Sequence, residues 1–232
     1  MKKFSILFFI VSTLIFAQQK DPNKLLNRIE EKFNKVKDYE VDVLVKLDFE
    51  MIKIPESKAK IYFKQPDKIK IDSKGFAMLP KQSTNFSPTQ FLKGDFTALY
   101  VRSETVDNRK LDVIKIIPNS DSTEVILSTL WIDDAEQLIR KVETTGRRSG
   151  TIHIFVDYNG NKFGLPSQIK FEFNLGSIQI PEDPRQQKEK TEDEKRPRGR
   201  QQLSGSVIIY YSNYKVNQGI ADSFFDEKKE KN

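Results

Sequence analysis

The stretch that decides the fold is residues 39–51, YEVDVLVKLDFEM, in which apolar and polar residues alternate with Leu44 as the one interruption. The apolar set is Tyr39, Val41, Val43, Val45, Leu47, Phe49 and Met51. A period of two predicts a β-strand with one apolar face, and this run exceeds the usual five or six residues of a strand. Such a long strand is typical of a large, strongly twisted antiparallel sheet or a barrel wall.

A helical pattern precedes this strand. Apolar residues recur three and four positions apart at Leu25, Leu26, Ile29, Phe33 and Val36, and lysines, Arg and Glu occupy the opposite side. This spacing predicts one amphipathic helix of about four turns, capped at its start by Asp21 or Asn23 and ending near Asp38.

Further alternating runs follow, separated by short turn sequences rich in Pro, Asn, Asp and Gly. They cover residues 58–64, 68–72, 97–104, 110–117, 123–132, 138–144, 151–157, 167–174 and 206–214. The sequence therefore predicts about ten strands. Since no crossover helices lie between them, the sheet is expected to be antiparallel.

Two stretches depart from the alternation. Residues 73–95 contain Gly and Pro but also Phe76, Met78 and Leu79, so this irregular segment carries too much apolar material for a solvated linker. Residues 181–203 mix acids and bases with almost no apolar side chain, which favours a disordered charged insertion between two strands.

The composition excludes several classes of function. The chain of 232 residues has no Cys, one His (His153) and a formal net charge of +6. Disulfides, zinc ribbons, thiol catalysis and multi-His metal sites are therefore excluded, and the modest interspersed charge is poor evidence for nucleic-acid binding. We expect no catalytic residues, no metal and no cofactor; Asp133, Asp134 and Glu136 are expected to serve the chemistry of a turn.

The N-terminus reads as an export signal. Two lysines precede an apolar run from Phe4 to Phe16, and Ala17 follows. This order predicts a cleavable signal peptide over residues 1–17, because a membrane-spanning helix needs roughly 20 apolar residues. We expect residues 18–232 to form a single exported domain with no transmembrane segment.

The predicted sheet has more apolar surface than one short helix can cover. Either it closes and fills its interior, or it stays partly open with a hydrophobic hollow roofed by the helix and the segment around residues 73–95. Hydrophobic walls alone could hold lipid, since burying a 16-carbon chain is worth on the order of 12 kcal/mol gross. Alternation by itself does not distinguish a filled core from a lined cavity.

Several motifs resemble those of the periplasmic outer-membrane lipoprotein-sorting (LolA-like) family. They are Val36-Lys37-Asp38-Tyr39 at the entry to the first strand, the run from Ala59 to Lys70 around Gln65-Pro66, Leu130-Trp131-Ile132-Asp133 with Leu138 to Lys141, and Gly219 to Phe224 near the end. The resemblance implies an open antiparallel β half-barrel, mainly β with flanking helices, whose concave face is apolar and covered by a lid. By resemblance, the cavity is lined by Val41, Val43, Val45, Leu47, Phe49, Ile61, Phe63, Ile69 and Ile71. The lid would contain Leu25, Ile29, Phe33, Phe76, Met78 and Leu79.

The function implied by this resemblance is that of a monomeric periplasmic carrier. It would shelter lipoprotein acyl chains, or another lipid, between an inner-membrane donor and an outer-membrane acceptor. The alternative is an envelope-stress sensor of the same fold that binds a protein partner. One departure is Gln65, where the well-known carriers often have an Arg that latches the lid; a hydrogen bond from Gln is weaker than a charged one.

Overall fold

The computed structural model describes residues 20–49, 52–53, 55–73, 92, 94–120, 122–160, 163–175 and 203–226. It contains a helix, α1 (Pro22–Phe33), followed by a β-sheet and a short 3-10 helix, η4 (Asp222–Phe225). Asp21 caps α1, because its side chain accepts a hydrogen bond from the backbone of Asn23, and Pro22 occupies the first turn.

The strands confirm the alternation in the sequence. They are β1 (Asp38–Phe49), β2 (Ile52–Lys53), β3 (Ser57–Lys64), β4 (Lys68–Asp72), β5 (Phe96–Val106), β6 (Arg109–Pro118), β7 (Val125–Asp133), β8 (Leu138–Gly146), β9 (Gly150–Asp157), β10 (Gln168–Leu175) and β11 (Leu203–Val216). Every pairing between them is antiparallel, as tight connections demand.

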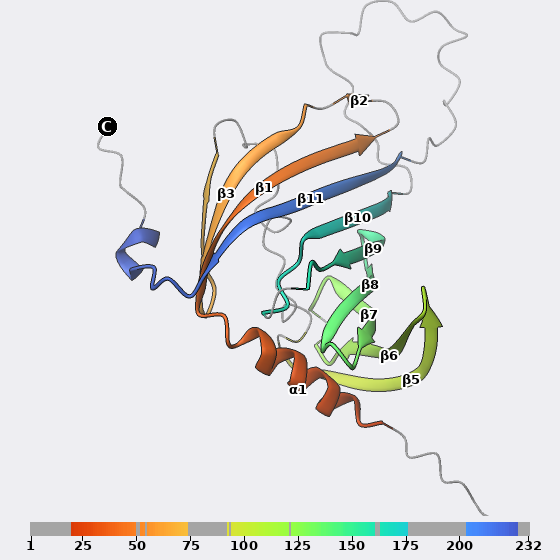
Figure 1. The fold of residues 1–232 in the computed structure, drawn as a ribbon. Helices are drawn as coiled ribbons and strands as arrows, with labels where there is room; N and C mark the ends of the chain where they lie inside the picture. The colour runs from red at the N-terminus through yellow and green to blue at the C-terminus, as the bar shows by residue number, and fades with distance from the viewer. Residues whose placement is uncertain are drawn as a thin grey trace, which may run out of the picture.

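The sheet is open. Its strand order is β4-β3-β1-β11-β10-β9-β8-β7-β6-β5, with the short β2 paired to β1, so β4 and β5 form the two ends of the order. The sheet curls strongly, and α1 lies across one end of it between the edges (Figure 1). This arrangement is the expected mainly-β half-barrel with a flanking helix, rather than a closed barrel.

The apolar core lies on the inner face of the sheet, the face that contacts α1. Leu25, Leu26 and Ile29 of α1 pack with buried residues of β6 to β10, and Phe33 packs with buried residues of β1, β3 and β11. The helix therefore contacts both clusters of the core. It can do so because the apolar residues of an amphipathic helix form one stripe along its length.

The helix ends one turn earlier than the sequence predicts. α1 stops at Phe33, and Asn34 follows as the C-terminal cap. The backbone beyond it is held by Asn217, whose side chain accepts from the amide of Lys37 and donates to the carbonyl of Lys35. Val36 is 0% exposed, so its apolar character reflects burial in the core rather than continuation of the helix.

Some sequence predictions fall outside the described residues. These are the signal peptide at 1–17, the lid residues Phe76, Met78 and Leu79, and residues 181–202 of the charged insertion. Leu203, the last residue assigned to that insertion, already begins β11. In the part of the chain that the structure describes, no helix has both the length and the apolar character needed to cross a bilayer.

Candidate functional site

An uninterrupted apolar row crosses the inner face. Cross-strand partners follow one another from β5 to β1 as Tyr100, Ile114, Leu130, Val142, Ile154, Phe171, Val207 and Leu47. Residues opposite each other in antiparallel strands point to the same face, so these side chains form a continuous greasy surface across the sheet. This row of side chains forms the central part of the candidate site.

The predicted cavity residues all belong to this inner face, as far as their side chains are described. Val41, Val43, Val45, Ile61 and Phe63 share one buried cluster, and Leu47, Ile69 and Ile71 pack against it. Phe49 lies in β1, but its side chain is outside the described part of the structure. The register agrees, because Ile61 lies opposite both Val41 and Ile71, and Phe63 lies opposite Ile69.

Burial divides this set in two. Val41, Val43, Val45, Ile61 and Phe63 are each at most 3% exposed, so they are core beneath and beside α1. Leu47, Ile69 and Ile71 are only partly buried. Fewer of the predicted cavity residues are exposed to a ligand than the sequence suggests, because most of them are already covered by other side chains of the core.

A half-buried group gathers at the end of the inner face remote from the start of β1. We call it the distal patch; it consists of Leu47, Ile152, Phe171 and Phe173. Phe171 connects to Leu47 through Val207, and Phe173 lies opposite Ile152. The Phe171 and Phe173 rings are stacked with their centroids 6.3 Å apart. In the register, Phe49 and Phe173 both lie opposite Gly205.

The predicted lid is placed in part. Leu25 and Ile29 are 3% exposed and Phe33 is 8% exposed, all three against the inner face. Sequence reasoning missed the contribution of β6 to β11 to the same surface, which includes Ile114, Leu130, Phe171 and Phe173. Their strands showed the same alternation, so extending the face assignment across every strand would have found them.

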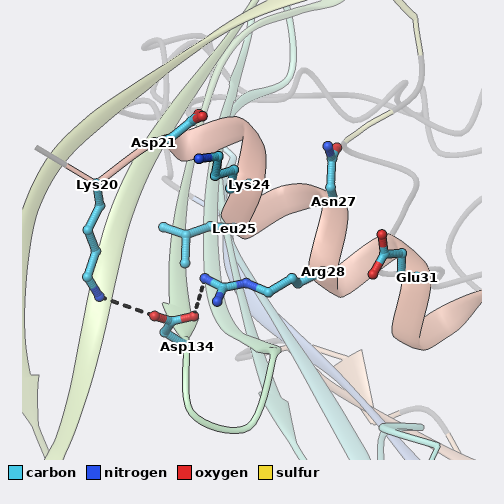
Figure 2. Close-up of a pocket in the computed structure, with 8 residues that line it drawn as sticks. All are labelled: Lys20, Asp21, Lys24, Leu25, Asn27, Arg28, Glu31 and Asp134. Atoms are coloured by element: carbon cyan, nitrogen blue, oxygen red, sulfur yellow. Dashed lines mark hydrogen bonds and ion pairs between the residues drawn. The ribbon is translucent and has the colours of Figure 1, made fainter.

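A network of charges anchors the start of α1. Lys20 and Arg28 both reach Asp134 in the turn between β7 and β8, at 3.2 and 2.6 Å (Figure 2). Lys20 also contacts Asp112 of β6 at 2.6 Å. The adjoining hollow of about 440 Å³ is lined by as many acids as bases, so it suits ion pairs rather than a hydrocarbon. Asp134 thus serves to hold the helix, which is more than the turn chemistry predicted for it.

Asp112 is the buried member of this network, with 1% of its surface exposed. Burial raises the pKa of its carboxyl, but hydrogen bonds from Lys20, Ser103 and Tyr100 outweigh that effect, so the pKa lies below its ordinary value. The carboxylate is therefore held ionised, and it fixes the segment that leads into α1.

At the opposite end of α1, Gln65 contacts the residues that follow the helix. Its side-chain amide donates to the carbonyl of Asn34 at 3.3 Å, and its backbone amide donates to Lys37 at 2.9 Å. This contact at the helix end is a neutral hydrogen bond, which is weaker than a charged one.

The remaining polar candidates stay in ordinary roles. His153 lies 3.4 Å from Glu143 across two strands, and Asp133 accepts from the backbone of Glu136 at 3.1 Å. Within the described residues, no group of three or more His, Asp or Glu side chains is arranged to hold a metal ion.

Comparison with solved structures agrees with this geometry. A DUF1329 family protein from Desulfovibrio piger superposes with a TM-score of 0.57 at 14% identity, covering 89% of this chain and 98% of the other. A LolA superfamily protein from Nitrosomonas europaea gives a TM-score of 0.54 at 12% identity, covering 90% and 98%. This chain has the LolA-like fold. No protein-family model matches the sequence, and a comparison with curated proteins finds no match.

Proposed function

We propose that this protein is a periplasmic carrier that binds acyl chains, of lipoproteins or of other lipid, on the inner face of its half-barrel. It would take them from a donor at the inner membrane and release them to an acceptor at the outer membrane. The observation that carries this proposal is the distal patch, in which aromatic and aliphatic side chains on the inner face remain only half-buried. No covalent chemistry is part of the proposal.

The physical basis is the hydrophobic effect. Half-buried Phe171, Phe173, Leu47 and Ile152 continue directly from a buried core, so a hydrocarbon chain laid on them covers apolar area on both partners. At about 0.8 kcal/mol per buried CH₂, micromolar binding (about −8 kcal/mol), with at least about 4 kcal/mol lost on association, requires nearly complete burial of one 16-carbon chain or partial burial of two. The fold likeness to a LolA superfamily protein supports the same assignment.

Native mass spectrometry with a synthetic diacylated lipopeptide tests the proposal. The purified protein, without its predicted signal peptide, should form a one-to-one complex. Phe173→Glu should weaken binding at least tenfold, because a carboxylate in an apolar site opposes the acyl chain. The matched control is Glu172→Gln on the same strand, whose side chain points to the outer face and should leave the affinity within twofold.

Two results would contradict the proposal. One is the absence of binding to any diacyl or triacyl peptide by the unaltered protein. The other is unchanged binding by Phe173→Glu when circular dichroism shows that the variant is folded. Copurification of a membrane regulator instead of lipid would favour the envelope-stress sensor.

A further inference from the structure

The outer face of the sheet carries a row that alternates cations with apolar side chains. Successive cross-strand partners from β5 to β1 are Arg102, Val113, Trp131, Lys141, Phe155, Lys170, Ile208 and Lys46. All of them except Arg102 are direct sequence neighbours of residues in the inner apolar row, and Arg102 lies opposite Val113, so this row faces away from α1. Apolar residues on the face opposite the core call for an explanation.

A cavity of about 550 Å³ opens over the middle of this row. We call it the outer groove. It is lined by Glu104, Val106, Asp107, Arg109, Leu111, Trp131, Arg140, Lys141, Phe155, Val156, Asp157 and Tyr158. Its volume lies within the roughly 300–1,000 Å³ of ligand sites, and the hairpin of β5 and β6 forms one wall.

Trp131 forms the floor of the outer groove and is held rigidly. It is 9% exposed and packs with Leu111 and Val113. Its indole N–H donates to Glu104 at 2.5 Å, and Arg102 fixes the same carboxylate at 2.6 Å. A fixed indole is a good base for a binding site because little conformational entropy remains to be lost on binding.

Lys141 differs from the other cations of the row. Lys46 and Lys170 form ion pairs with Glu56 and Glu172, at 2.7 and 2.6 Å. Among the described residues Lys141 forms no ion pair; its ammonium lies over the rings of Trp131 and Phe155, 4.3 and 5.6 Å from their centroids. Arg109 of the opposite wall likewise has no ion-pair partner in the described part of the chain.

A third cation adds an unused donor. Arg140 pairs through its terminal nitrogen with Glu136 and lies over the ring of Tyr158, 5.0 Å from the centroid. Its Nε is buried and has no hydrogen-bond partner in the described structure. A buried guanidinium N–H without a partner is unfavourable unless an acceptor enters.

We propose that the outer groove binds a short peptide segment of a partner protein that carries a carboxylate next to an aromatic or aliphatic side chain. The carboxylate would pair with Lys141 and Arg109. The neighbouring apolar side chain would replace the Lys141 ammonium on the faces of Trp131 and Phe155. This recognition uses a surface separate from the inner face and does not depend on lipid binding.

The charges of the outer groove favour this occupant over an anionic membrane surface. Asp107 and Asp157 lie in the lining together with Glu104, so a dense layer of phosphates would meet three carboxylates. A peptide with a single carboxylate brings one negative charge to these cations instead of many, so it meets less of that repulsion, and its apolar neighbour can contact the aromatic rings. The concave shape of the groove also suits a protruding segment better than a flat bilayer.

Trp131 is the single tryptophan of the chain, so its fluorescence reports on the outer groove alone. We would titrate the protein with the capped peptide acetyl-Gln-Phe-Glu-Leu-amide, which carries one carboxylate, and with the matched basic peptide acetyl-Gln-Phe-Lys-Leu-amide. The acidic peptide should change the Trp131 emission in a saturable way at micromolar to millimolar concentration. The basic peptide should bind at least tenfold more weakly.

Variants test the assigned residues. Lys141→Gln and Arg109→Gln should each weaken the acidic peptide at least fivefold by isothermal titration calorimetry. Lys170→Gln, two strands along the same row but already paired with Glu172, should leave its affinity within twofold. None of the three should alter lipopeptide binding, which distinguishes failure of this inference from failure of the proposed carrier function.

Equal binding of the acidic and basic peptides would overturn the proposal. It would also be overturned if the acidic peptide changed neither the Trp131 emission nor the heat measured by calorimetry. It would also be overturned if phosphatidylglycerol vesicles, and not the peptide, changed the Trp131 emission.

Discussion

The inner face of the half-barrel has two regions that are built from the same kinds of residue and differ in what covers them. Beneath α1, residues such as Leu130, Ile114 and Val45 are at most 1% exposed. In the distal patch, Phe171 and Phe173 are as apolar but remain half-buried. Apolar character alone therefore does not mark a binding surface. The proposed binding surface differs from the core in one respect, which is that the described part of the protein's own chain leaves its apolar side chains partly uncovered.

The largest expected effect comes from truncation in the region beneath α1. Leu130→Ala removes a side chain with 0% exposure and leaves a cavity, so the free energy of unfolding should fall by about 2–5 kcal/mol. Phe173→Ala in the distal patch should cost only roughly 1–2 kcal/mol, because part of its ring is already in water. Urea unfolding of both variants checks this order, and equal losses would refute the division into two regions.

The second-largest loss of stability is expected when the ion pairs at the start of α1 are disrupted. Asp112→Asn removes the carboxylate that Lys20 contacts at 2.6 Å, and we expect a loss of about 1–3 kcal/mol at neutral pH. Asp112→Asn should not change lipopeptide binding by the distal patch once the protein is folded, since the two lie in different regions of the sheet.

The same carboxylate gives a pH dependence with a definite sign. The pKa of Asp112 is lowered in the folded protein, so its contribution is present above the unfolded value of about 3.9 and is lost as the pH falls through the lower folded value. Stability should therefore decline below about pH 4, and Asp112→Asn should show a smaller decline. Urea midpoints at pH 7 and pH 3 measure this difference; an identical decline in both proteins would contradict it.

The smallest loss of stability is expected when the hydrogen bond of Gln65 at the other end of α1 is removed. Gln65 donates to Asn34 at 3.3 Å near the surface, so Gln65→Ala should cost no more than about 0.5–1 kcal/mol. Gln65→Arg should restore a charged donor and at least match the unaltered protein in thermal unfolding. If Gln65→Ala cost as much as Asp112→Asn, the two ends of α1 would be held equally, contrary to the structure.

Most of the fold could be predicted from sequence because period-two alternation and the α1 stripe are local signals. The end of α1 could not, because Asn217, far along the chain, holds the backbone at Lys35 and Lys37. The described apolar residues predicted between positions 41 and 71 do share the core face of the sheet, but their degree of burial was not predicted. Whether Val43 or Phe173 stays accessible depends on where α1 lies, and alternation carries no information on that.

The outer groove shows a similar limit. Trp131 was recognised only as part of a motif, and nothing in the sequence indicated that Lys141 and Phe155 would lie beside it. That juxtaposition depends on the register of β7, β8 and β9. Register is set by turns and by the whole buried pattern, so a single strand read alone does not reveal it.

The place of β1 in the sheet has a consequence for how the chain reaches its native state. The first long strand pairs with the last, β11, and contacts such as Asn213 with Asp42 join residues 171 positions apart. During synthesis this junction cannot form until residue 216 has left the ribosome, so a nascent chain is expected to stay incompletely folded until then.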